Sequence, residues 1–215
     1  MASSFPGAID SFTDPLSGSA LNSPSHSAQH ADLNDAAEKI ETYMGLVKVI
    51  PTGATNGTVG STGTVTIGST VGSVTVSGCF SALYNAYKII LTGGAASAQG
   101  DIKMTLGATV AGYYQAVIYT AWNNTVAAAS TNNGASWERA GITETISPTL
   151  NVELVNPFLS ERTTISGSFI GADSTRVGGW GSGFIADTTS YTAFTITPST
   201  GTLTGGSLTI YGYRI

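Results

Sequence analysis

The sequence contains few of the side chains that carry most enzyme chemistry. Its 215 residues include one cysteine, Cys79, and two histidines, His26 and His30. A single cysteine excludes a disulfide within the chain and a zinc site built from several cysteines of one chain. Cys79 follows Gly78 at the expected end of a strand, so we expect a buried free thiol that packs as a small apolar side chain.

Charged residues are also scarce, at 10% of the chain against roughly 25% in an ordinary soluble protein. This favours a protein that covers much of its surface with copies of itself, or one whose surface is dominated by Ser, Thr, Asn and Gly. The net charge of −5 comes from residues 1–45, while residues 46–215 are neutral. No segment is basic enough to follow a phosphate backbone, so we expect no nucleic-acid partner.

Long apolar runs are missing too. No window approaches the length of a membrane span, and no basic start leads into an apolar stretch of the kind found in signal peptides. We therefore expect neither membrane insertion nor a secretory leader.

The sequence contains no recognisable set of catalytic residues. A Ser-His-Asp site needs a histidine near its nucleophile, but both histidines lie outside the β-rich part of the chain. A glycosidase needs two facing acids, and the seven acidic residues after residue 45 form no recognisable pair, so we expect them at the surface or in salt bridges. The sequence predicts no enzyme, no catalytic residues, no metal and no cofactor.

One convincing helix is expected, over residues 23–45. Ser23 suits the N-cap, Pro24 the first helical position, and Gly45 the left-handed residue that closes a helix. A seam with a 3.5-residue repeat runs along it, and its members are His26, His30, Leu33, Ala37, Ile40 and Met44. So narrow a stripe needs partners, and copies of the same chain are the simplest ones. We predict a homotrimer, although the seam also allows a dimer.

The two histidines of this seam have two interpretations. One turn apart, His26 and His30 could chelate a metal. They could instead fix the register of the seam or bond the free N–H groups near the start of the helix. We favour the second interpretation, because no third ligand lies nearby at a metal-site spacing.

Residues 1–22 are too interrupted by Pro and Gly for a regular element. They nevertheless carry three isolated large apolar residues, Phe5, Ile9 and Phe12. Flexible tails seldom contain so many, so we expect these three to anchor an extended arm on a neighbouring protein; the alternative is a disordered tail.

The run from Phe5 to Pro15, followed by Leu21-Asn22-Ser23-Pro24-Ser25-His26-Ser27-Ala28-Gln29-His30 and Asn34-Asp35, resembles the N-terminal module of tailed-bacteriophage fibre and minor structural proteins. The likeness covers residues 5–45. The part from Val74 to Arg214 is similar, more loosely, to small β-domains at fibre tips. The resemblance implies a virion surface protein, often trimeric, that attaches to other virion proteins by its N-terminus. It does not distinguish a tail location from a head location.

The rest of the chain predicts an all-β fold. About eight runs of alternating or solid apolar residues, separated by turn residues, indicate an antiparallel β-sandwich or jelly-roll-like domain over residues 74–215. The expected strands are 74–76, 87–91, 102–106, 114–119, 150–154, 163–170, 191–196 and 207–211. Residues 1–45 form the arm and helix. Residues 46–73 are expected to be a Gly/Ser/Thr-rich linker or intertwined strands.

Three expected loops carry tryptophan: Trp122 with Asn123, Trp137, and Trp180 among glycines. Tryptophan can stack on sugar rings while neighbouring amides bond hydroxyls. Packing in the core or at a subunit interface is the more common role, since Trp is mostly buried. Trp180 is the best candidate for exposure, because its glycine neighbours offer nothing to cover it.

These observations predict a phage tail fibre or minor tail protein whose β domain adheres to host-surface glycans. The alternative is a head fibre or capsid decoration protein, whose acidic arm would fit a basic groove of the shell.

Overall fold

The computed structural model describes residues 26–43, 45–121, 124–173 and 176–213. The chain divides into two units, one ending at Val47 and one spanning Lys48–Tyr213. Each unit is considered by itself below. The predicted anchors Phe5, Ile9 and Phe12 lie outside the described residues, as do Met44, Trp122 and Asn123.

The first unit contains the helix α1 (His26–Tyr43), which confirms the predicted helix. Gly45 has a φ of +73°, the left-handed conformation that a glycine adopts without strain at the end of a helix. Two residues of the predicted seam are exposed in the single chain, Leu33 at 60% and Ile40 at 44%. The seam and the homotrimer remain predictions.

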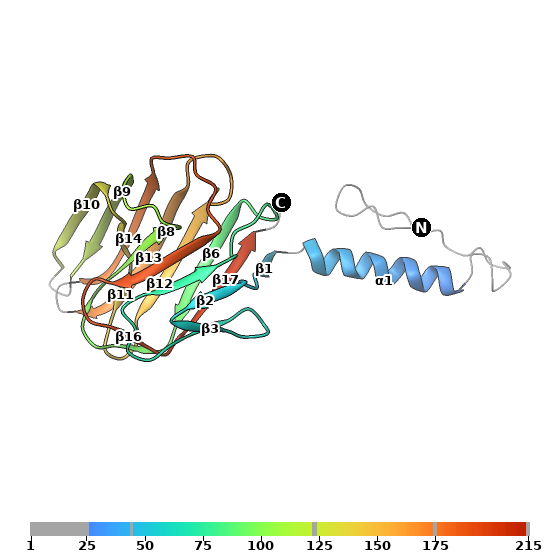
Figure 1. The fold of residues 1–215 in the computed structure, drawn as a ribbon, viewed down its shortest axis with the longest axis horizontal. Helices are drawn as coiled ribbons and strands as arrows, with labels where there is room; N and C mark the ends of the chain where they lie inside the picture. Colours follow the sequence, from blue (N-terminus) through green and yellow to red (C-terminus); the bar gives the residue numbers. More distant parts are fainter. Residues whose placement is uncertain (1–25, 44, 122–123, 174–175, 214–215) are drawn as a thin grey trace. The chain divides into compact units, whose positions relative to one another are not determined.

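The second unit is an antiparallel β-sandwich, as predicted. Its larger layer, called sheet I here, has the strand order β10-β9-β14-β13-β12-β6-β17-β4-β3, and sheet II has the order β11-β8-β15-β5-β2 (Figure 1). The strands of sheet I are β3 (Gly57–Val59), β4 (Val65–Ile67), β6 (Ala86–Thr92), β9 (Tyr113–Thr120), β10 (Val126–Gly134), β12 (Thr149–Val155), β13 (Thr164–Asp173), β14 (Arg176–Ile185) and β17 (Ser207–Tyr213). Those of sheet II are β2 (Gly53–Thr55), β5 (Val74–Ser77), β8 (Gly100–Leu106), β11 (Trp137–Thr143) and β15 (Ala193–Pro198). Three short strands complete the list, β1 (Leu46–Lys48), β7 (Ala95–Ala96) and β16 (Leu203–Thr204).

The chain crosses repeatedly between the two sheets. It runs from β5 in sheet II to β6 in sheet I, returns in β8, forms the β9–β10 hairpin in sheet I, and crosses again through β11, β12 and β15. This alternation is typical of jelly rolls. The two layers belong to one hydrogen-bonded sheet, because β12, the middle strand of sheet I, also pairs with the edge strand β11 of sheet II, through Leu150 with Gly141 and Thr149 with Ile142.

The core lies between the sheets and is filled mainly by large apolar side chains. The largest fully buried ones include Trp137, Tyr87, Tyr113, Phe194, Ile89, Ile102, Met104 and Leu154. Gln115 of β9 is one of the buried polar side chains. It donates from Nε2 to the carbonyl oxygen of Arg139 at 2.9 Å, and its Oε1 accepts from the Arg139 N–H at 3.0 Å. Gln115 thereby ties β9 to β11 across the sandwich with both of its amide groups satisfied.

All eight predicted strands are present, with ends that differ by at most three residues. The structure differs over residues 46–73, where a linker or intertwined strands was expected. There β2 pairs with β5, β3 with β4, and β4 with β17, all within this chain. Asn56, with a φ of 60°, is the single residue at the bend between β2 and β3, where the chain passes from sheet II to sheet I. Short Thr-Val alternations are therefore enough to extend the sandwich here.

Candidate functional site

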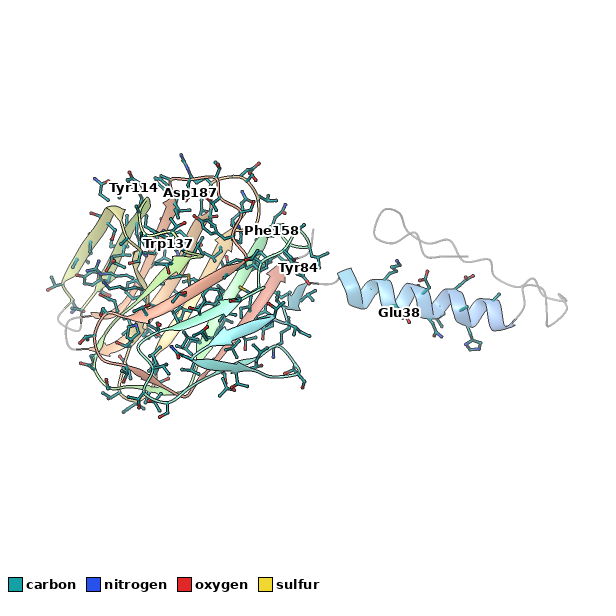
Figure 2. The ribbon with its side chains drawn as sticks, viewed as in Figure 1. Glu38, Tyr84, Tyr114, Trp137, Phe158 and Asp187 are labelled. Atoms are coloured by element: carbon teal, nitrogen blue, oxygen red, sulfur yellow. The ribbon has the colours of Figure 1, made fainter. Side chains whose placement is uncertain are left out.

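Two of the three predicted tryptophan loops, those of Trp137 and Trp180, are strands in the structure. Trp137 begins β11 and is 0% exposed, so its assignment to a ligand surface is wrong. Its indole N–H donates to the carbonyl oxygen of Phe184 at 3.3 Å, and its ring meets that of Tyr113 edge-on at 5.1 Å. Figure 2 shows Trp137 within the body of the domain and Tyr114 at its margin.

Trp180 lies in the middle of β14 and is 53% exposed, in agreement with the prediction for this residue. The reason for its exposure is different from the one expected. Strand alternation points Trp180, Ser182 and Phe184 outward, while Gly179, Gly181 and Gly183 face the interior. The glycines therefore belong to the packing of the core.

Contacts of these glycines show why the inward positions have no side chain. A Cβ at Gly179 would lie 2.6 Å from both the carbonyl oxygen of Ile118 and the ring of Phe169. A Cβ at Gly181 would lie 2.5 Å from Val117. The inward side of β14 is thus filled by side chains of β9 and β13, and its outward side is left to carry exposed residues.

The outward residues of β9, β14 and β13 form one surface, called the β9–β14–β13 face here. Strand register places Ile118, Trp180 and Ser168 side by side in one row, and Ala116, Ser182 and Ser166 in the next. A third row contains Tyr114, Phe184 and Thr164. Aromatic rings thus stand at the middle of β14, at Trp180, and near its C-terminal end, at Phe184, separated by small residues over a span of about 13 Å at the rise of a strand.

A groove with a volume of about 610 Å³ occupies one end of this face. Its lining comes from β9, β13 and β14, together with Thr131 of β10 and Arg162. The volume is within the range of roughly 300–1,000 Å³ that is common for ligand sites. The groove is open to solvent and is lined by hydroxyl groups as well as by aromatic rings.

A three-member stack forms one wall of the groove. The rings of Tyr114 and Phe184 are nearly parallel, with centroids 4.8 Å apart and an interplanar angle of 9°. The guanidinium of Arg162 lies 4.7 Å from the centre of the Phe184 ring. Because β9 and β13 flank β14, Tyr114 and Arg162 approach Phe184 from opposite sides. The stack holds a cation at the surface through ring contacts.

The nearest carboxylate in register with the groove already has partners. Glu153 of β12 pairs with Ser166 in the strand register, accepts a hydrogen bond from the Tyr213 hydroxyl, and lies 3.4 Å from the Lys88 ammonium. The hydrogen bond from the Tyr213 hydroxyl is the main cause of the lowered pKa of Glu153. Burial acts in the opposite direction, and the nearby Lys88 charge lowers this pKa further. Reciprocally, Glu153 raises the pKa of Tyr213 to about 12.

Other acidic residues of the domain form ion pairs on sheet II. Glu138 lies 2.7 Å from Lys103, and Asp101 lies 3.7 Å from Arg139. These contacts, together with the one between Glu153 and Lys88, confirm the expectation of salt bridges for three of the acids. Among the described residues, no group of three or more His, Cys, Asp or Glu side chains could hold a metal ion.

Cys79 is buried and free, as expected. Burial raises the pKa of its thiol to about 12, which outweighs the opposing backbone hydrogen bonds. The thiolate that a nucleophile needs is therefore almost unpopulated at neutral pH. In the part of the chain that the structure describes, no helix has the length and apolar character required to cross a membrane.

Comparison of the chain with protein-family models, with curated proteins and with solved structures gives no match. The interpretation of the β9–β14–β13 face therefore depends on its own residues. Sequence reasoning found Trp180 and the strand of Tyr114 but missed Phe184 and Arg162. The available signal was the period-two pattern Trp180-Gly181-Ser182-Gly183-Phe184, which is that of a strand with glycines on one side.

Proposed function

We propose that this protein is a virion surface fibre that attaches through residues 1–45 and binds a cell-surface glycan on the β9–β14–β13 face. The glycan assignment is supported mainly by one observation, the exposed Trp180 ring beside a row of hydroxyls and small side chains. An aromatic face packs against the apolar side of a sugar ring, and serine hydroxyls bond sugar hydroxyls. The virion assignment is supported by the likeness of residues 5–45 to phage fibre modules.

The chemistry of the face suits weak, repeated attachment. The groove is shallow and open, so one site buries only part of an oligosaccharide. Several copies of the chain on one particle would bind a dense glycan surface with an avidity far above the affinity of one site. Because charged residues are scarce in this chain, general electrostatic attraction contributes little to this mode of binding.

Replacing Trp180 with alanine is expected to lower the affinity of one site for its glycan at least tenfold, because the stacking surface is lost. Arrays printed with bacterial capsular and O-antigen polysaccharides would identify the glycan, and calorimetry with its monovalent oligosaccharide would measure the affinity. Ile146→Ala is a suitable control, because Ile146 is 85% exposed and lies outside this face. Unchanged binding by Trp180→Ala, or no glycan bound by the wild-type chain, would contradict the proposal.

The location of the protein on the particle separates the two virion assignments. An antibody against the β domain is expected to label one end of the tail in electron micrographs of intact particles. Labelling scattered over the shell would instead support the head fibre or decoration protein, for which the six acidic residues before residue 45 offer a surface complementary to a basic groove.

A further inference from the structure

We propose that the glycan bound on the β9–β14–β13 face carries a carboxylate and that the guanidinium of Arg162 recognises it. This inference rests on the proposed function and assigns a chemical class to the ligand. Among the described residues that line the groove, Arg162 is the only charged one. A site for a neutral glycan has no need of a cation at that position.

The surroundings of Arg162 fix the guanidinium in a position to bind. Arg162 lies two residues before the start of β13, and the first residue of that strand, Thr164, pairs with Phe184 in the strand register. The Phe184 ring holds the guanidinium by one face, and Tyr114 supports that ring from the other side. Ring contact leaves the N–H groups at the edge of the guanidinium free to donate. Their fork geometry matches the two oxygens of a carboxylate.

Carboxylates near Arg162 are engaged elsewhere. Among the described residues, no carboxylate lies within ion-pair distance of Arg162, since the recorded pairs join Glu153 to Lys88, Glu138 to Lys103 and Asp101 to Arg139. Glu161, which is next to Arg162 in sequence, accepts a hydrogen bond from Asn156 at 3.3 Å. The cation at the groove is therefore available for an anion from outside the chain.

Hydroxyl groups surround the same space. Within the part of the chain that the structure describes, the side chains of Thr164, Ser166 and Ser182 make no hydrogen bond, and all three line the groove. A sugar ring placed over Ser166 and Ser182 would lie between Trp180 at one end and the Arg162 stack at the other. A carboxylate on that ring would then reach Arg162 while the ring contacts Trp180.

A test uses the full chain with two matched probes, an acidic capsular oligosaccharide containing uronic acid and the same oligosaccharide after chemical reduction of its carboxyl groups. The wild-type chain is expected to bind the acidic probe at least tenfold more tightly. Arg162→Gln is expected to lower the affinity for the acidic probe to that for the reduced probe, and Arg162→Lys to recover only part of it. Trp180→Ala is expected to weaken the binding of both probes.

Lys88→Gln is the matched control, because Lys88 lies on the outer surface of the same sheet but already has Glu153 as its partner. It should leave both affinities unchanged. Equal loss from Lys88→Gln and Arg162→Gln would indicate general electrostatic attraction and overturn the inference. Equal binding of the two probes by the wild-type chain, or binding confined to sulfated or phosphorylated glycans, would overturn the carboxylate assignment and leave glycan adhesion standing. Binding of no glycan of any class would overturn both proposals.

Discussion

Trp137→Ala is expected to lower the free energy of unfolding by about 3–5 kcal/mol, the usual cost of removing a fully buried tryptophan. The side chain is 0% exposed, packs edge-on against Tyr113, and donates to the carbonyl oxygen of Phe184. Its loss would leave a cavity between sheets I and II and remove the hydrogen bond to the Phe184 carbonyl oxygen. Urea unfolding followed by far-ultraviolet circular dichroism measures the change without depending on tryptophan fluorescence.

Trp180→Ala is the control for this experiment, since it removes the same side chain from a position that is 53% exposed. Its effect on the free energy of unfolding should stay within about 0.5 kcal/mol, as for most surface substitutions. The two variants therefore separate two expected roles of tryptophan, a contribution to stability at Trp137 and the proposed contribution to glycan binding at Trp180. Equal destabilisation by both would mean that Trp180 is covered in the folded protein, and that the β9–β14–β13 face is not free to bind a glycan.

Gly179→Ala is expected to destabilise the protein by about 2–3 kcal/mol, because the new methyl group has no space. It would lie 2.6 Å from the carbonyl oxygen of Ile118, which is backbone, and 2.6 Å from the ring of the buried Phe169. Neither neighbour can move without disturbing the pairing of β14 with β9 or the packing of the core. Thermal and urea unfolding at a fixed protein concentration would measure the effect.

Gly178→Ala provides a control one residue away on the same strand. The nearest atom to a Cβ at this position is 3.9 Å distant, so the methyl group fits without displacement. We expect a change within about 0.5 kcal/mol of zero. If the two variants were equally stable, the assignment of inward and outward positions on β14 would be wrong, and with it the outward direction of Trp180 and Phe184.

The strands that were predictable from sequence have apolar residues on the side that faces the core. Leu150, Val152 and Leu154 of β12 alternate with polar residues, and all three are buried. On β14 three successive inward positions, Gly179, Gly181 and Gly183, are glycines, so this part of the strand lacks an apolar signal and was expected to be a loop. Glycine occupies these positions because large side chains of neighbouring strands fill the adjacent space. The local sequence pattern does not reveal those neighbours.

The candidate site was less predictable than the fold for a related reason. Tyr114, Arg162 and Phe184 are separated in sequence by 48 and 22 positions and meet only through the register of β9, β14 and β13. Single-sequence reasoning located Tyr114 on a strand and Trp180 at the surface. It had no means of pairing them with the other two residues, because register is set by contacts distant in the chain.

The division of β14 into constrained inward and unconstrained outward positions has a consequence for how this protein can change over time. If the β9–β14–β13 face binds a glycan as proposed, substitutions at Trp180, Ser182 or Phe184 would alter what it recognises, whereas the glycines between them preserve the packing of the core. Under the proposed function, ligand recognition could therefore diversify while the free energy of folding stays nearly constant. A library randomised at the outward residues of β9, β14 and β13 would sample new ligand preferences on one unchanged scaffold.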